Sequence, residues 1–160
     1  MPLREIRRAA AVLVAALCAL VLVACAASPT PTTPEGEPDM DKAAVTAAIE
    51  EIPGVASADV GAFNTGTPGS FAARIALTLD ESGLARLGEV LHEAVRAVAA
   101  DPGDYATYEF EVTAPDESEP SDLIVLTLSR YRDGIPFSQG TYLGSTLSLT
   151  ASELAEVAAG

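Results

Sequence analysis

The sequence contains no tryptophan, two cysteines and a single histidine among its 160 residues. Common zinc sites are built mostly from cysteine and histidine ligands, so this composition excludes them. The same scarcity leaves Ser-His and Cys-His catalytic pairs without support, because His92 is the only histidine that could act as a base. The sequence also lacks the G-x-S-x-G, P-loop and G-x-G-x-x-G motifs. These absences predict a chain that is not an enzyme and that uses neither a metal nor another cofactor.

Basic residues are scarce as well. One lysine and eight arginines stand against 23 acidic residues, and the net charge is −14. Residues 1–24 contain three of the arginines and one glutamate, so the remainder carries six basic and 22 acidic residues, a net charge of −16. Such an excess argues against a nucleic acid partner, because the phosphate backbone attracts basic surfaces. It also keeps a folded domain away from anionic lipid head groups.

The longest apolar run follows the basic segment MPLREIRR and extends from Ala9 to Ala24. A basic start before an apolar run is typical of a secretory signal peptide. The sequence Leu22-Val23-Ala24-Cys25 at its end resembles the lipobox of bacterial lipoproteins. The resemblance implies that Cys25 receives a diacylglyceryl group and that signal peptidase II cuts before it, after which the new amino terminus is open to acylation. An uncleaved membrane anchor is the alternative, because about 20 apolar residues span a bilayer.

We therefore expect three parts: a lipoprotein signal peptide over 1–24, a lipidated Cys25 with a disordered, Pro-rich, acidic tether over 25–39, and a single α+β domain over 40–160. The tether has four prolines and no large apolar residue, so it cannot form a core. Cys18 leaves with the signal peptide, and lipid blocks Cys25. The domain must then be stable without a disulfide. This organisation places the protein on the extracytoplasmic face of the cell membrane, held by its lipid anchor.

Two segments of the expected domain share the order helix, Pro-Gly, strand, loop, strand. The first has a helix over 40–52 and strands over 55–63 and 71–79. The second has a helix over 84–99 and strands over 105–112 and 123–131. At an offset of 49 residues Pro53-Gly54 aligns with Pro102-Gly103, and Ile75 aligns with Ile124. The pattern predicts a duplicated αββ unit that forms a four-stranded antiparallel sheet with both helices on one face.

The last part of the chain gives one clear signal. Thr150-Ala-Ser-Glu153 has the pattern of a capping box and predicts a short C-terminal helix over 150–158. For residues 132–149 the sequence does not decide between a strand and a loop.

The strand pattern predicts an apolar strip of Leu123, Val125 and Tyr131 on the face of the sheet away from the helices. An apolar strip on an open face usually has a cover or a partner. One alternative is that residues 135–160 fold back and cover it. The other is that Tyr131 and Arg132 contact a partner in the envelope, since tyrosine and arginine are enriched at interface hot spots.

These observations predict a membrane-anchored extracytoplasmic lipoprotein with a small, non-catalytic binding or interaction domain. The alternative is an envelope hydrolase of unrecognised type that uses carboxylates. The acidic loop with Asp116, Glu117, Glu119 and Asp122 leaves unanswered whether a calcium ion binds there, although the spacing does not match an EF-hand. His92 lies on the flank of its expected helix, where we expect it to be solvated.

Overall fold

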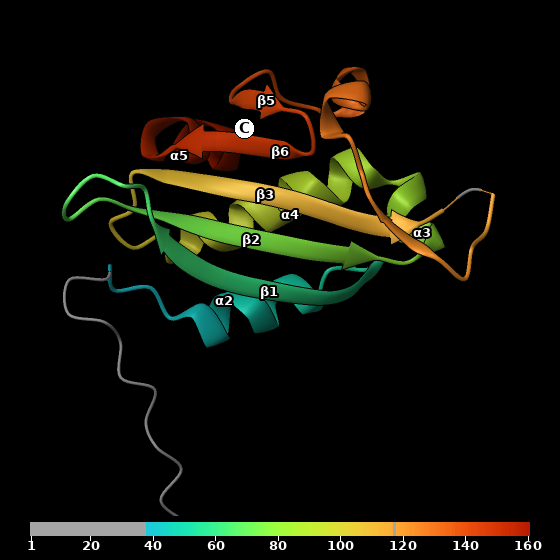
Figure 1. Ribbon diagram of the computed structural model, residues 1–160, viewed down its shortest axis with the longest axis horizontal. Helices are drawn as coiled ribbons and strands as arrows, with labels where there is room; N and C mark the ends of the chain where they lie inside the picture. Colours follow the sequence, from blue (N-terminus) through green and yellow to red (C-terminus); the bar gives the residue numbers. More distant parts are fainter. Residues whose placement is uncertain (1–37, 117) are drawn as a thin grey trace, which may run out of the picture. The chain divides into compact units, whose positions relative to one another are not determined.

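The computed structural model describes residues 38–116 and 118–160 (Figure 1). Cys25, the expected signal peptide and most of the expected tether lie outside this part of the chain. The helices are α2 (Lys42–Glu50), α3 (Glu81–Ala85), α4 (Leu87–Ala100) and α5 (Ala151–Ala159). The strands are β1 (Val55–Asn64), β2 (Phe71–Leu79), β3 (Thr107–Pro115), β4 (Leu123–Val125), β5 (Thr141–Leu143) and β6 (Thr146–Thr150). Two short 3-10 helices, η1 (Leu128–Arg130) and η2 (Arg132–Gly134), connect β4 to β5.

The strands form one mixed sheet in the order β1-β2-β3-β6-β5, and β4 pairs with β3 beyond the end of β6. Every pair is antiparallel except β2 with β3, which is parallel. The expected α+β class and the short C-terminal helix are confirmed. The expectation of a four-stranded antiparallel sheet is wrong, because β2 and β3 run in the same direction and the C-terminal segment adds two strands.

The parallel pairing follows from the connection between the two central strands. Parallel neighbours require a crossover rather than a tight turn. Here α3 and α4 provide it, so the chain crosses one face of the sheet before it enters β3. Figure 1 shows α2 and α4 on the same side of the sheet, behind β1, β2 and β3, and α5 lies against α4 and β6. Among the described residues, no helix combines the length and apolar character needed to cross a bilayer.

The core lies between the sheet and this helical layer. Alternate residues of β2 and β3 are buried on the helical side, among them Ile75, Leu77, Tyr108 and Phe110. The residues between them, such as Glu109, face the other side, as the period of two for a strand requires. The sequence predicts this alternation, because apolar residues recur at every second position from Phe71 to Leu79 and from Tyr108 to Val112, and the structure confirms it.

Helices α2, α3 and α5 begin where short polar side chains satisfy free backbone N–H groups. Asp41 accepts a hydrogen bond from the N–H of Ala44 at the start of α2, at 3.0 Å. Thr150 and Glu153 form the expected capping box of α5. The helix expected over 84–99 is instead split into α3 and α4 at Arg86, whose φ of −120° is not helical.

The second of the two expected αββ units does not have the same structure as the first. β4 has only three residues, whereas the aligned strand β2 has nine. Ile75 is fully buried, but Ile124 is 41% exposed. The reason is competition for the edge of β3: residues 146–150 pair with positions 107–111, so the chain after Val125 leaves the sheet and forms η1 instead of a long strand.

The C-terminal segment does not cover the apolar strip of the open face. Leu147, Leu149, Leu154 and Val157 are buried, but they belong to the core on the helical side. Pairing with β3 fixes this outcome, because the alternation of β6 places Leu147 and Leu149 beside Phe110 and Tyr108. The expectation that residues 135–160 cover the strip is therefore wrong.

Truncation of the two aligned isoleucines should have very different effects on the free energy of unfolding. Ile75→Ala removes a buried side chain and should cost about 2 to 5 kcal/mol. Ile124→Ala removes a half-exposed side chain and should cost less than about 1 kcal/mol. Urea unfolding of both variants measures the difference, and equal losses would contradict the pairing described above.

Candidate functional site

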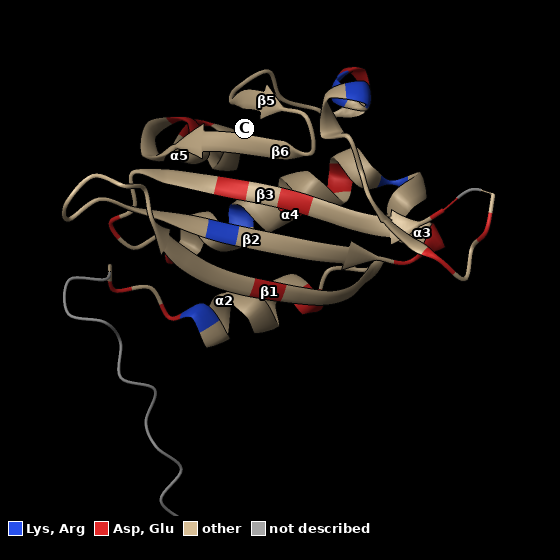
Figure 2. Ribbon diagram, in the orientation of Figure 1, with Lys and Arg blue, Asp and Glu red and all other residues tan. Residues whose placement is uncertain are grey.

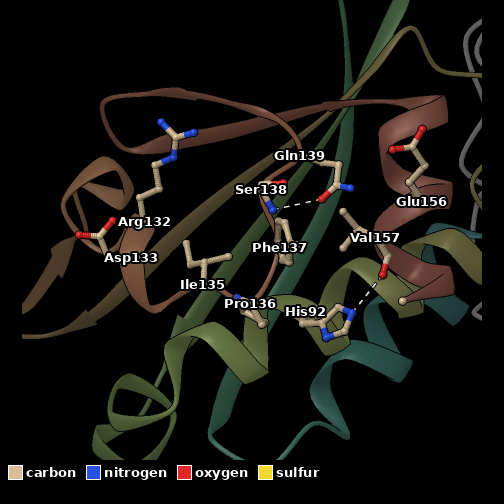
Figure 3. A pocket seen from close by; sticks show the side chains of 11 residues that line it. His92, Arg132, Asp133, Ile135, Pro136, Phe137, Ser138, Gln139, Glu156 and Val157 are labelled. Atoms are coloured by element: carbon tan, nitrogen blue, oxygen red, sulfur yellow. Dashed lines mark hydrogen bonds between the residues drawn. The ribbon is translucent and has the colours of Figure 1, made fainter.

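A large hollow opens between α4, α5 and the segment 132–139 (Figure 3). Its volume is about 740 Å³. Apolar groups come from Ile135, Pro136, Phe137 and Val157. Polar and charged groups come from His92, Arg132, Asp133, Ser138, Gln139 and Glu156.

A close backbone contact holds one side of this hollow. Gly88 in the first turn of α4 lies against Gly134, and a Cβ at position 88 would collide with the carbonyl oxygen of Gly134. The 3-10 turns continue this contact: the N–H of Gly134 donates to the carbonyl of Tyr131 at 2.9 Å, and the buried side chain of Ile135 anchors the segment to the core. Only glycine allows the segment to approach α4 so closely.

The carboxylate of Glu153 holds the other end of the segment. One oxygen accepts a hydrogen bond from the N–H of Gly140 at 3.3 Å, and the other accepts from the N–H and hydroxyl of Thr150, both at 2.8 Å. These hydrogen bonds from Thr150, chiefly that of its backbone N–H, hold the pKa of Glu153 below its ordinary value. The capping box of α5 therefore also fixes the loop that enters β5.

His92 connects α4 to α5 at the base of the hollow. Its Nε2 lies 3.0 Å from the carbonyl oxygen of Val157 (Figure 3). A carbonyl only accepts hydrogen bonds, so Nε2 carries the proton. The imidazole ring is tilted against Phe137, with 5.9 Å between ring centroids. The expectation of a solvated histidine is wrong, because α5 and the segment 132–139 pack over this flank of α4.

Tyr131 and Arg132, the expected contact residues, are both exposed but do not share one site. Arg132 lines the large hollow, and its guanidinium carbon lies 5.6 Å from the centre of the Tyr142 ring. Tyr131 lines a second hollow of about 300 Å³ at the start of α4, beside Arg86 and Gly88. Burial raises the pKa of Tyr142, and the charge of Arg132 opposes that rise.

The part of the chain that the structure describes contains no group of three or more His, Cys, Asp and Glu side chains placed to hold a metal ion. In the same part, no hydrogen bond joins His92 to a serine hydroxyl or to a carboxylate. The described side chains around the hollow therefore place one half-buried histidine among apolar, polar and charged groups.

Comparison of the chain with protein-family models, with curated proteins and with solved structures finds no match.

Sequence analysis missed the large hollow. Its lining comes from three separate segments, and only their packing brings them together. One local signal was present: Gly88 interrupts an otherwise apolar helix face, and a glycine inside a helix usually reflects a close approach of other backbone. The sequence around Gly134, the segment that approaches Gly88, has no feature that predicts packing against α4.

Replacing Gly88 with alanine should displace the segment 132–137 from α4. Alanine favours the helix by about 1 kcal/mol, but the collision with Gly134 should cost about 1 to 3 kcal/mol. We expect a lower melting temperature and faster amide exchange at Ile135. Gly134→Ala is the matched control, because a Cβ there meets no atom within 4 Å. An equally large loss of stability in both variants would show that the contact is not the cause.

Proposed function

We propose that this chain is a lipoprotein anchored on the extracytoplasmic face of the cell membrane. The basic start, the apolar run and the lipobox-like sequence before Cys25 support this proposal. Two acyl chains at one cysteine suffice for stable anchoring, whereas a single chain binds membranes only marginally. The acidic, Pro-rich segment that follows would act as a spacer between the lipid surface and the domain.

The domain would act as a non-catalytic binding module, and the large hollow carries this part of the proposal. Its volume of about 740 Å³ falls in the usual range for small-molecule sites, which is about 300 to 1,000 Å³. Ile135, Phe137 and Val157 supply an apolar surface, and Arg132 supplies a cation beside it. This combination suits a ligand with an apolar part and an anionic group, because a guanidinium binds carboxylate and phosphate oxygens well.

A carboxylate-dependent envelope hydrolase is the second candidate. One observation favours it: Asp133 and Glu156 line the same hollow. Both residues are exposed, whereas a carboxyl group that acts as a general acid usually lies in an apolar pocket that keeps it protonated. Binding without catalysis therefore fits the hollow better.

Cys25→Ala should block both lipidation and cleavage. In a bacterial host that processes lipoproteins, mass spectrometry of the wild-type protein should find a lipidated N-terminal peptide that begins at Cys25. The variant should retain residues 1–24. A wild-type chain that still begins at residue 1 or 2 would contradict the anchor.

Binding at the hollow can be measured with 8-anilinonaphthalene-1-sulfonate, a fluorescent probe that combines aromatic rings with one sulfonate. We expect Arg132→Gln to weaken binding of the probe about tenfold, the effect of losing one charge-assisted hydrogen bond. Phe137→Ala should weaken it as well. Arg96→Gln on the exposed face of α4 controls for net charge, and Leu123→Ser controls for the exposed apolar strip. If only Leu123→Ser weakens binding, the hollow is not the site.

A further inference from the structure

Most of the exposed large apolar side chains gather at one end of the sheet. Leu123, Ile124 and Val125 make up the whole of β4 and are 58%, 41% and 58% exposed. Leu143 at the end of β5 is 66% exposed, and Tyr131 follows η1. Contiguous apolar surface of this kind marks an interaction site in a soluble domain.

The turn after β5 lies beside η1, and a backbone hydrogen bond joins the two segments. The N–H of Ser129 donates to the carbonyl oxygen of Gly144 at 3.2 Å. The exposed Leu143 therefore lies close to the chain that leaves β4. We call the four residues Leu123, Val125, Tyr131 and Leu143 the apolar end patch. Ile124 is not part of it, because it pairs with the buried Ala114 and its side chain therefore lies on the helical side of the sheet.

The outer edge of β4 is unpaired. The carbonyl oxygen of Asp122 accepts a hydrogen bond from the N–H of Asp116, which follows β3, and the N–H of Leu126 donates to the carbonyl oxygen of Val112 in β3. The backbone groups of the even-numbered positions of this segment therefore face β3. Antiparallel alternation then directs the backbone N–H and C=O groups of Leu123 and Val125 away from β3. No hydrogen bond from another described residue reaches these groups. An unpaired apolar edge is a template for another strand.

The sign of the charge changes along the chain across β4. The exposed residues Glu119 and Asp122 precede it, and the exposed residues Arg130 and Arg132 follow it. Figure 2 shows acidic residues on the loop before β4, whereas the 3-10 turns after it carry Arg130 and Arg132 together with Asp133. Within the described part of the chain, neither of these two arginines forms an ion pair with a carboxylate. The segment is thus acidic at one end, apolar in the middle and basic at the other end.

We propose that β4 pairs antiparallel with β4 of a second copy of this chain, about a two-fold axis at Ile124. Leu123 of each copy then pairs with Val125 of the other, and their free backbone groups satisfy one another. The acidic end of each copy meets the arginines of the other. Leu123 and Val125 of the two copies, which are the part of the apolar end patch on β4, then pack side by side on one face of the joined sheet in an isologous two-fold interface.

Charge complementarity selects this partner and this direction. A parallel pair of β4 strands would place acid beside acid and arginine beside arginine, and like charges across an interface are strongly unfavourable. An antiparallel pair of identical segments is complementary at both ends. This inference depends neither on the large hollow nor on the lipid anchor, because it rests on β4 and its flanking charges alone.

A cysteine at the two-fold axis tests the geometry. The backbone N–H and C=O groups of Ile124 face its own β3. In the proposed dimer the two copies of position 124 therefore form a non-hydrogen-bonded pair, with Cα atoms about 4.5 Å apart. That separation lies within the range of a disulfide. The full chain carrying Ile124→Cys, solubilised in detergent and oxidised with copper phenanthroline, should form a covalent dimer. Ser57→Cys, exposed on β1, is the matched control, and the wild type gives the background from Cys18 and Cys25. Equal crosslinking at positions 57 and 124, or none above background, would overturn the proposal.

A charge exchange tests the complementarity. One variant carries Arg130→Glu and Arg132→Glu, and the other carries Glu119→Arg and Asp122→Arg. By sedimentation in detergent the wild-type chain should dimerise, and each variant alone should self-associate at least about tenfold more weakly. A mixture of the two should dimerise again, because each acidic end then meets a basic one. Glu51→Arg with Glu93→Arg, at the exposed C-cap of α2 and an exposed position of α4, controls for net charge. A monomeric wild type, or a mixture that stays monomeric, would refute the pairing.

Discussion

The parallel pairing of β2 with β3 determines where the other elements can lie. It requires a crossover, and the crossover places α4 against the buried alternation of both strands, where Ile75 and Phe110 meet the helix. It also leaves one edge of β3 free along its length. That edge is divided: the first half pairs with β6 and the second half pairs with β4. The C-terminal segment thereby becomes part of the same sheet, and α5 becomes part of the same helical layer.

The large hollow results from the path of the chain between β4 and β6, which pair with the two halves of the same edge of β3. After β4 it must return past the start of α4 before it can enter β5 and β6. Gly88 permits the close approach, Ile135 anchors it, and Glu153 holds its far end through Gly140. The segment is therefore fixed at both ends and spans the gap between α4 and α5. The space beneath it is lined by apolar groups from the core side and by polar groups from the loop.

The centre of the open face and the β4 end of the sheet differ in how their arginines are paired. On the open face Arg74 forms an ion pair with Glu111 across β2 and β3. At the β4 end, apolar side chains stand beside arginines that form no ion pair within the described residues. In a chain with so few basic residues, that concentration sets this end apart from the rest of the surface. The proposed self-association and the proposed ligand site therefore lie in different regions and share only Arg132.

The sequence alone determined the local features. The period of two along β2 and β3 identified their buried residues, and Thr150 with Glu153 identified the start of α5, because strand alternation and helix capping depend only on residues near one another in the chain. Only the tertiary structure decided which strands pair, and in which direction. That decision depends on competition between distant segments for one edge of β3, and it shortened β4, buried Leu147 and Leu149 on the helical side, and left Leu123 and Val125 exposed. It also decided the surroundings of His92, because its neighbours Phe137 and Val157 come from segments whose sequence does not indicate that they pack against α4.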